Sequence, residues 1–224
     1  MQDLADRVAE VRGRIAEAVR RGGHGQPVRL VAVTKTHGPE VVEAVHACGI
    51  EDVGENRVQE ALEKQAGVTV PVRWHLIGHL QRNKVKALEH FWLLHALDSA
   101  RLADAVSQYG VGRGRPVDAL LQVNVVDEET KGGFSLAEVA GEAERLRGRP
   151  GVRVVGAMTM APFAADEATL RRCFTGARRA REALRAAGHP AEELSMGMSG
   201  DYEIAVEEGA TMVRVGTVLF GERH

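Results

Sequence analysis

The sequence predicts an α/β protein in which eight parallel strands, each followed by a helix, close into a single (β/α)8 TIM barrel with an extra N-terminal helix. Short apolar segments alternate with helical segments along the whole chain, and no linker rich in Pro, Gly and Ser interrupts them. The 224 residues are somewhat fewer than the about 250 typical of such barrels. We therefore expect one domain over residues 1–224, of which 1–22 form the leading helix.

The leading helix is indicated by apolar residues at spacings of three and four, among them Leu4, Val8, Val11 and Ile15. Gly22-Gly23 is a typical helix end. Because this helix precedes the first strand, it lies outside the alternating series and covers one part of the fold.

Eight segments of strand length follow, most of them apolar and bounded by turn residues. Continuous apolar runs, as in Leu30 to Val33, are typical of strands buried on both faces in a parallel sheet. The expected strands are residues 29–35, 50–53, 72–77, 91–97, 117–125, 152–160, 193–198 and 211–215.

Helices are expected between these strands. Pro39 occupies a favoured first-turn position of the first of them, and Ser135 with Glu138 forms a capping-box pattern. The expected helices are residues 39–48, one after 56, a short basic one at 81–89, 99–109, 135–146, 166–187, and one that follows 199–201 and ends at 209. Residues 218–221 form an apolar tail. An open doubly wound sheet is the rival fold, but no Gly-x-Gly-x-x-Gly turn follows the first strand.

Composition excludes several classes of function. Charges nearly cancel, with 29 basic and 31 acidic residues, which argues against nucleic-acid or membrane-surface binding driven by bulk charge. Cys48 and Cys173 lack the spacing of metal ligands, and a reduced, cytoplasmic setting is the simpler interpretation. The N-terminus has no apolar signal core, and no apolar run spans a bilayer. The acidic loop 127–133 lacks the spacing of a calcium loop, so we expect it to be solvated.

In a barrel, all strand ends meet at one mouth. This would gather Lys35, Asn56, His75, Asn124, Met160, Ser199 and Arg214 around one pocket. A lysine amine in a partly dry pocket is a nucleophile toward carbonyls. Taken alone, however, Lys35 more often pairs with an acid or stays solvated.

The last two units contain the strongest local pattern. Ser199-Gly200 follows the seventh strand and Gly216-Thr217 follows the eighth, where barrels commonly hold a phosphate through backbone N–H groups. Helix capping and a simple turn are the alternatives. Together the two motifs favour phosphate binding.

The residue pattern alone leaves the roles of three other polar residues undecided. Arg214 could point inward to a ligand or outward to an acid such as Glu207. His75 is more often a satisfied core residue than a catalyst, and Asn56 could be a helix cap.

Several motifs match one family together: Ala32-Val33-Thr34-Lys35, Gly54-Glu55-Asn56, Trp74-His75-Leu76-Ile77-Gly78, Ser195-Met196-Gly197-Met198-Ser199 and Thr211-Met212-Val213-Arg214-Val215-Gly216-Thr217. The chain resembles the pyridoxal 5′-phosphate homeostasis proteins, or proline synthase co-transcribed family, which are similar to the isolated barrel domain of alanine racemases. The match covers nearly the whole chain in order.

The resemblance implies a role for each candidate. Lys35 would form a reversible imine with pyridoxal 5′-phosphate; Ser199, Gly200, Gly216 and Thr217 would hold the phosphate; Arg214 would face the pyridine nitrogen, and Asn56 and His75 would line the ring. The chain departs from the pattern at His79, where many members have proline, and at Ser199-Gly200-Asp201-Tyr202.

The expected function is storage and delivery of the cofactor in the cytoplasm without strong catalysis. A cation at the ring nitrogen discourages its protonation and makes the cofactor a poor electron sink. A racemase also needs a second base, which alanine racemases take from a tyrosine of another domain, and neither Tyr109 nor Tyr202 lies at an expected strand end. The expected partners are the cofactor and pyridoxal phosphate-dependent apoenzymes, with no nucleic acid, membrane or metal, and the chain is expected to be a monomer. The alternatives are an amino-acid racemase of relaxed specificity and a class I aldolase-type barrel.

Overall fold

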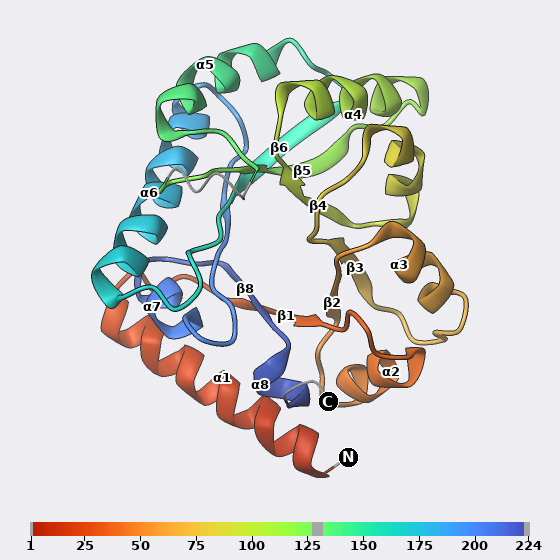
Figure 1. The fold of residues 1–224 in the computed structure, drawn as a ribbon, viewed down its shortest axis with the longest axis vertical. Coiled ribbons are helices and arrows are strands. Elements are labelled where there is room, and N and C mark those ends of the chain that lie inside the picture. Colours follow the sequence, from red (N-terminus) through yellow and green to blue (C-terminus); the bar gives the residue numbers. More distant parts are fainter. Residues whose placement is uncertain (1, 127–131, 222–224) are drawn as a thin grey trace.

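Eight parallel strands form a closed barrel in the computed structural model, which describes residues 2–126 and 132–221 (Figure 1). The strands are β1 (Arg29–Val33), β2 (Asp52–Glu55), β3 (Arg73–Leu76), β4 (Leu93–Leu97), β5 (Val117–Gln122), β6 (Val152–Met158), β7 (Glu193–Ser195) and β8 (Met212–Val215). Each pairs with its sequence neighbours, and β8 pairs with β1. This confirms the predicted TIM barrel.

Helices surround the barrel and connect its strands (Figure 1). They are α2 (Pro39–Ala47), α3 (Val58–Gln65), the 3-10 helix η1 (Arg82–His90), α4 (Ala100–Gly112), α5 (Leu136–Arg147), α6 (Glu167–Ala186), α7 (Tyr202–Glu207) and α8 (Thr217–Phe220). Pro39 begins α2, and Ser135 with Glu138 forms the predicted capping box of α5.

The extra N-terminal helix, α1 (Gln2–Gly22), packs outside the barrel against α7 and α8 (Figure 1). Its buried face carries Val8, Val11 and Ile15, as the spacing predicts. Arg7 donates a hydrogen bond to the carbonyl of Leu219, which ties α1 to the end of the described chain.

Apolar side chains fill two layers of the molecule. Outward-facing strand residues pack against the helices in one large core. Inside the barrel, a smaller cluster contains Val31, Leu93, Ala96, Leu120, Met158 and Met212, all buried. This packed interior confines an open cavity to one end of the barrel.

Several boundaries differ from the sequence prediction. β2 runs through Glu55 rather than ending at Val53, because Glu55 is buried beside Lys64, which a hydrophobicity pattern cannot anticipate. β5 ends at Gln122, and residues 217–220 are a helix rather than only an apolar tail. The predicted solvated loop falls mainly on residues 127–131, which lie outside the described residues.

Candidate functional site

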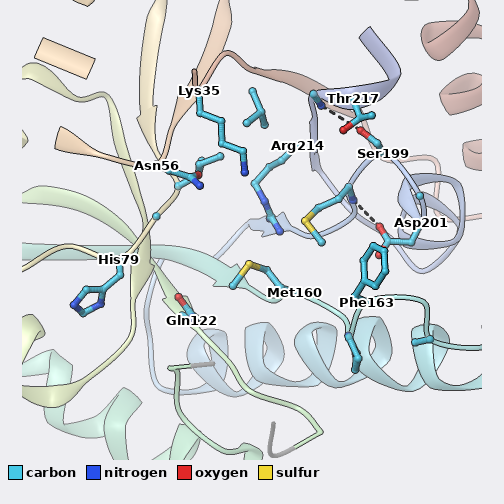
Figure 2. A pocket seen from close by; sticks show the side chains of 18 of the residues that line it. Lys35, Asn56, His79, Gln122, Met160, Phe163, Ser199, Asp201, Arg214 and Thr217 are labelled. Atoms are coloured by element: carbon cyan, nitrogen blue, oxygen red, sulfur yellow. Dashed lines mark hydrogen bonds between the residues drawn. The ribbon is translucent and has the colours of Figure 1, made fainter. Parts of the chain in front are cut away.

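A cavity of about 1090 Å³ opens at the carboxyl ends of the strands (Figure 2). Residues that follow each of the eight strands contribute to its wall. Seven predicted site residues are among them: Lys35, Asn56, Ser199, Gly200, Arg214, Gly216 and Thr217. Segments that lie far apart in the sequence therefore meet in one place.

Lys35 enters the cavity because side chains alternate in facing along β1 and its continuation. Val33 and Lys35 line the cavity, whereas Thr34 between them is buried on the outer side, where its hydroxyl donates to Glu55 at 2.6 Å. Figure 2 shows the half-buried Lys35 side chain pointing into the cavity between Asn56 and Arg214. The strand therefore supplies an amine to the interior of the site.

The turn after Lys35 is held from outside the barrel. Lys64 of α3 is buried, donates to the carbonyl of Thr34 at 2.7 Å and pairs with Glu55. Thr36 has a φ of 68°, an uncommon conformation for a β-branched residue, and its N–H donates to Glu60. These contacts fix the backbone on both sides of the lysine.

Asn56 lies at the end of β2, close to the end of β3. A Cβ at Gly78 would lie 2.3 Å from the Asn56 carbonyl oxygen, so only glycine fits where the two chain segments pass. Asn56 does not cap α3, because the N-cap residue of that helix is Arg57. Its amide side chain faces the cavity beside Lys35 (Figure 2).

The two C-terminal loops are joined by one hydroxyl. Ser199 Oγ accepts hydrogen bonds from the N–H groups of Gly216 at 3.2 Å and Val218 at 3.3 Å. Asp201 accepts from the N–H of Met198 at 2.6 Å and shapes the same turn. Ser199 therefore bridges to the next unit instead of capping its own helix. The hydroxyls and N–H groups of both loops meet at this side of the cavity (Figure 2).

Arg214 points into the barrel, not outward to Glu207, which instead pairs with Arg21 and Arg171. Its guanidinium donates to Ser195 Oγ at 2.5 Å and to the carbonyl of Thr159 at 2.9 Å. Burial lowers the pKa of Arg214 to about 10, which leaves it cationic at neutral pH. A fixed positive charge therefore faces the cavity near the Lys35 amine (Figure 2).

His75 is placed differently from the other predicted residues. It does not line the cavity but is fully buried in the barrel, where its two ring nitrogens contact Asp52 and His95, each at 2.8 Å. His75 therefore lies outside the cavity lining in which it was expected. The His75 side chain points into the barrel, but it lies deeper than the cavity at the carboxyl ends of the strands.

Sequence reasoning missed several cavity residues. His79 contacts Asp98 at 2.6 Å on the rim, and Gln122, at the end of β5, donates to the carbonyl of Gly132. Phe163, fully exposed, lies on the β6 side (Figure 2). The position of Asp98 and Gln122 at strand ends was a usable signal, whereas nothing in the pattern around Phe163 indicated a cavity wall.

Comparisons with known proteins place the chain in a family. The family model of the alanine racemase N-terminal domain matches residues 8–224. A pyridoxal phosphate homeostasis protein of Aquifex aeolicus is 41% identical over 225 residues, covering 99% of both chains. Its counterpart in Pseudomonas aeruginosa is 39% identical and covers 100% of this chain and 97% of that protein. The chain belongs to the pyridoxal phosphate homeostasis protein family.

Solved structures place the fold in the same family. PipY of Synechococcus elongatus, solved with pyridoxal phosphate bound, has a TM-score of 0.86 and 37% identity, with 97% of this chain and 100% of that chain covered. Alanine racemase of Corynebacterium glutamicum has a TM-score of 0.77 at 18% identity, covering 99% of this chain and 62% of that one. The latter likeness concerns the fold alone.

Two further observations describe the molecule as a whole. Within residues 2–126 and 132–221, no helix combines the length and the apolar character needed to cross a membrane. Over the same residues, no cluster of three or more His, Cys, Asp or Glu side chains has the arrangement of a metal site.

Proposed function

We propose that this protein binds pyridoxal 5′-phosphate in the cavity and serves the homeostasis of that cofactor, holding it on Lys35 and releasing it to apoenzymes. The main support for this proposal is that the amine of Lys35, the guanidinium of Arg214 and the loops that contain Ser199 and Thr217 line one cavity. The family membership and the pyridoxal phosphate-bound relative support the same assignment.

The side chains present match the groups of the cofactor. The Lys35 amine suits its aldehyde: condensation forms a carbon–nitrogen double bond and releases one water, and hydrolysis reverses the step. Ser199 and Thr217 hydroxyls, with the backbone of Gly200 and Gly216, suit a phosphate. Arg214 suits the ring nitrogen as a hydrogen-bond donor, and Asn56 lies beside the amine.

The same arrangement argues against strong catalysis. Because a guanidinium only donates hydrogen bonds, the pyridine nitrogen that faces it accepts one and stays unprotonated. Stabilisation of a carbanion by the cofactor relies on a protonated pyridine ring. Neither Tyr109 nor Tyr202 is among the described residues that line the cavity, so the tyrosine base used by alanine racemases has no counterpart there. We therefore propose a carrier, and we place it in the cytoplasm, where the free thiols of Cys48 and Cys173 would stay reduced.

The covalent step can be tested by trapping. Purified protein is incubated with pyridoxal 5′-phosphate, reduced with borohydride and digested for mass spectrometry. We expect one adduct on Lys35, its absence in Lys35→Ala, and an unchanged yield in Lys84→Ala, which removes an exposed lysine. An adduct mainly on another lysine would overturn the assignment of Lys35.

The carrier role has its own test. Stereoinversion of several amino acids should stay far below ordinary enzyme rates of about 1–1000 per second. Loaded protein should also activate a pyridoxal phosphate-dependent apoenzyme. Turnover within that range would instead support the relaxed-specificity racemase.

A further inference from the structure

Five buried polar side chains form a continuous hydrogen-bond chain through the barrel. Arg214 contacts Ser195 Oγ at 2.5 Å, and Ser195 Oγ contacts His95 Nδ1 at 2.8 Å. His95 Nε2 contacts His75 Nδ1, and His75 Nε2 contacts Asp52 Oδ1, both at 2.8 Å. Each of the five is at most 4% exposed. The chain thus joins the cavity at β8 to the opposite end of the barrel at β2.

The carboxylate at one end, together with neutral imidazoles, fixes the direction of the hydrogen bonds along the series. A guanidinium can only donate and an ionised carboxylate can only accept. Burial opposes ionisation of Asp52, but hydrogen bonds from Arg73 and His75 lower its pKa to about 2, so the group is a carboxylate at neutral pH. Arg214 is therefore the donor end of the series and Asp52 its acceptor end.

The inner members then have one consistent proton arrangement. Asp52 accepts, so His75 carries its proton on Nε2 and, as a neutral imidazole, accepts at Nδ1. His95 therefore carries its proton on Nε2 and donates it to Nδ1 of His75, which leaves Nδ1 of His95 as an acceptor. The Ser195 hydroxyl accepts from Arg214 and donates its own hydrogen to that nitrogen. Every donor has an acceptor, and both imidazoles are neutral.

Burial supports this neutral arrangement. It lowers the pKa of His75 and lowers that of His95 well below the ordinary value, with the charges of Arg214 and Arg29 acting in the same direction on His95. A second proton on the histidine pair would force His95 to donate toward Ser195, which already accepts from Arg214. The serine hydrogen would then lose its acceptor on His95.

The cavity end of the chain determines how the guanidinium can lie. One terminal nitrogen is held by Ser195 and the other by the Thr159 carbonyl, so rotation of the planar group would break two hydrogen bonds. Neither Ser195 nor His95 lines the cavity. Any influence on a bound molecule therefore passes through Arg214.

We propose that Ser195 and His95 are positioning residues for Arg214: the chain that continues to His75 and Asp52 holds the guanidinium in one orientation as a hydrogen-bond donor to the cavity. This deepens the proposed function, because on that function the donor meets the ring nitrogen of pyridoxal 5′-phosphate. The assignment extends the site by a layer of residues that would not touch the cofactor.

The first test uses the protein without cofactor. Nitrogen-15 NMR of labelled histidine should show His75 and His95 both protonated on Nε2 only, between about pH 7 and 8. A slowly exchanging guanidinium signal, assigned by its absence in Arg214→Lys, should be lost in Ser195→Ala and His95→Gln. It should persist in Ser195→Thr, which keeps the hydroxyl, and in Met158→Leu, a buried control inside the same barrel.

The second test adds pyridoxal 5′-phosphate. His95→Gln should shift the absorption maximum of the bound cofactor and weaken binding roughly threefold to tenfold, the scale of one well-placed hydrogen bond. Met158→Leu should do neither. An Nδ1-protonated His95, or an unchanged guanidinium signal and spectrum in both His95→Gln and Ser195→Ala, would overturn the positioning role. If the wild type binds no cofactor, the proposed function fails, whereas the first test still decides the orientation of Arg214.

Discussion

Ser199 joins two neighbouring units of the barrel through a single oxygen atom. Its hydroxyl lies after β7 but accepts from two N–H groups after β8. This contact brings the Ser199-Gly200 and Gly216-Thr217 loops together at one side of the cavity. At the residue scale, phosphate selectivity should depend on these hydroxyls rather than on the Lys35 amine.

The double variant Ser199→Ala, Thr217→Val should change the preference between ligands. Loss of two hydroxyl donors to the phosphate should weaken binding of pyridoxal 5′-phosphate by about a hundredfold or more, since hydrogen bonds to charged groups contribute about 1.5–3 kcal/mol each. Pyridoxal, which lacks the phosphate, should lose far less. Fluorescence titration with both ligands measures this, and equal weakening of both would contradict the phosphate assignment.

The residues at strand ends could be predicted because the barrel itself gathers them. Lys35 and Asn56 follow β1 and β2 at the end of the barrel where the cavity opens. The facing of Arg214 could not be predicted from the pattern, because alternation along the strand allowed an inward or an outward side chain. The role of His75 could not be predicted in the same way. Whether an inward histidine reaches the mouth depends on its depth in the barrel, and that depth is set by strand register.

At the element scale, Lys64 of α3 holds the end of β2 through a buried ion pair and the end of β1 through a hydrogen bond to the carbonyl of Thr34. Lys64 of α3 is 4% exposed and its partner Glu55 of β2 is completely buried. Burial raises the pKa of Glu55 even though Lys64 and Thr34 donate to it. The Lys64 cation of α3 thus offsets the free-energy cost of burying the Glu55 carboxylate next to β1.

Removal of one partner should therefore be strongly destabilising. Lys64→Met leaves Glu55 buried without its cation and should lower the free energy of unfolding by about 3–5 kcal/mol. Lys64→Met with Glu55→Leu should recover most of the loss, because no uncompensated charge remains. Urea unfolding measures both. The exposed Lys84→Met serves as control, and a Lys64→Met effect no larger than that of Lys84→Met would show that the pair is not needed.

The elements themselves could largely be predicted, with errors that have physical causes. Apolar runs and glycine ends located every strand and the major helices, since these report burial and turn geometry directly. The prediction ended β2 too early because Glu55 and the paired Lys64 are polar yet buried. It missed α8 because four residues, Thr217–Phe220, are too few to show helical periodicity.

On the scale of the whole molecule, a polar chain inside an apolar barrel makes stability depend on pH. His75 faces Asp52, Arg73, Arg29 and His95, and His95 faces Ser195 and Arg214. Both folded-state pKa values lie below the ordinary 6.5. Below pH 6.5 the unfolded chain therefore binds more protons than the folded chain. The contribution of the neutral histidines to the free energy of unfolding is complete above that pH and is lost as the pH falls.

The loss should be steep. Each neutral buried imidazole contributes about 1.4 kcal/mol per pH unit once the solution is below the unfolded pKa and above the folded one. Urea unfolding at pH values from about 7 to 5 should show this slope, and His95→Gln should reduce it by about one proton. His90→Gln, which changes a half-exposed histidine, should leave it unchanged. A slope that is identical in wild type and His95→Gln would contradict the neutral state of His95. Asp52, with a folded pKa of about 2, adds a further loss only between about 4 and 2.

The end of the barrel opposite the cavity is covered by a tryptophan and two arginines. The Trp92 ring is tilted against the His75 ring, with 5.0 Å between their centroids. The guanidinium groups of Arg29 and Arg73 lie 5.1 Å and 5.7 Å from the centroid of the Trp92 ring. Above this floor, Val31, Leu120, Met158 and Met212 are packed without exposure. Among the described residues, this packing separates the cavity from the other end of the barrel. A ligand then enters and leaves at the carboxyl ends of the strands, where the exposed Phe163 lies in the cavity wall, and a protein that received the ligand directly would approach from that side.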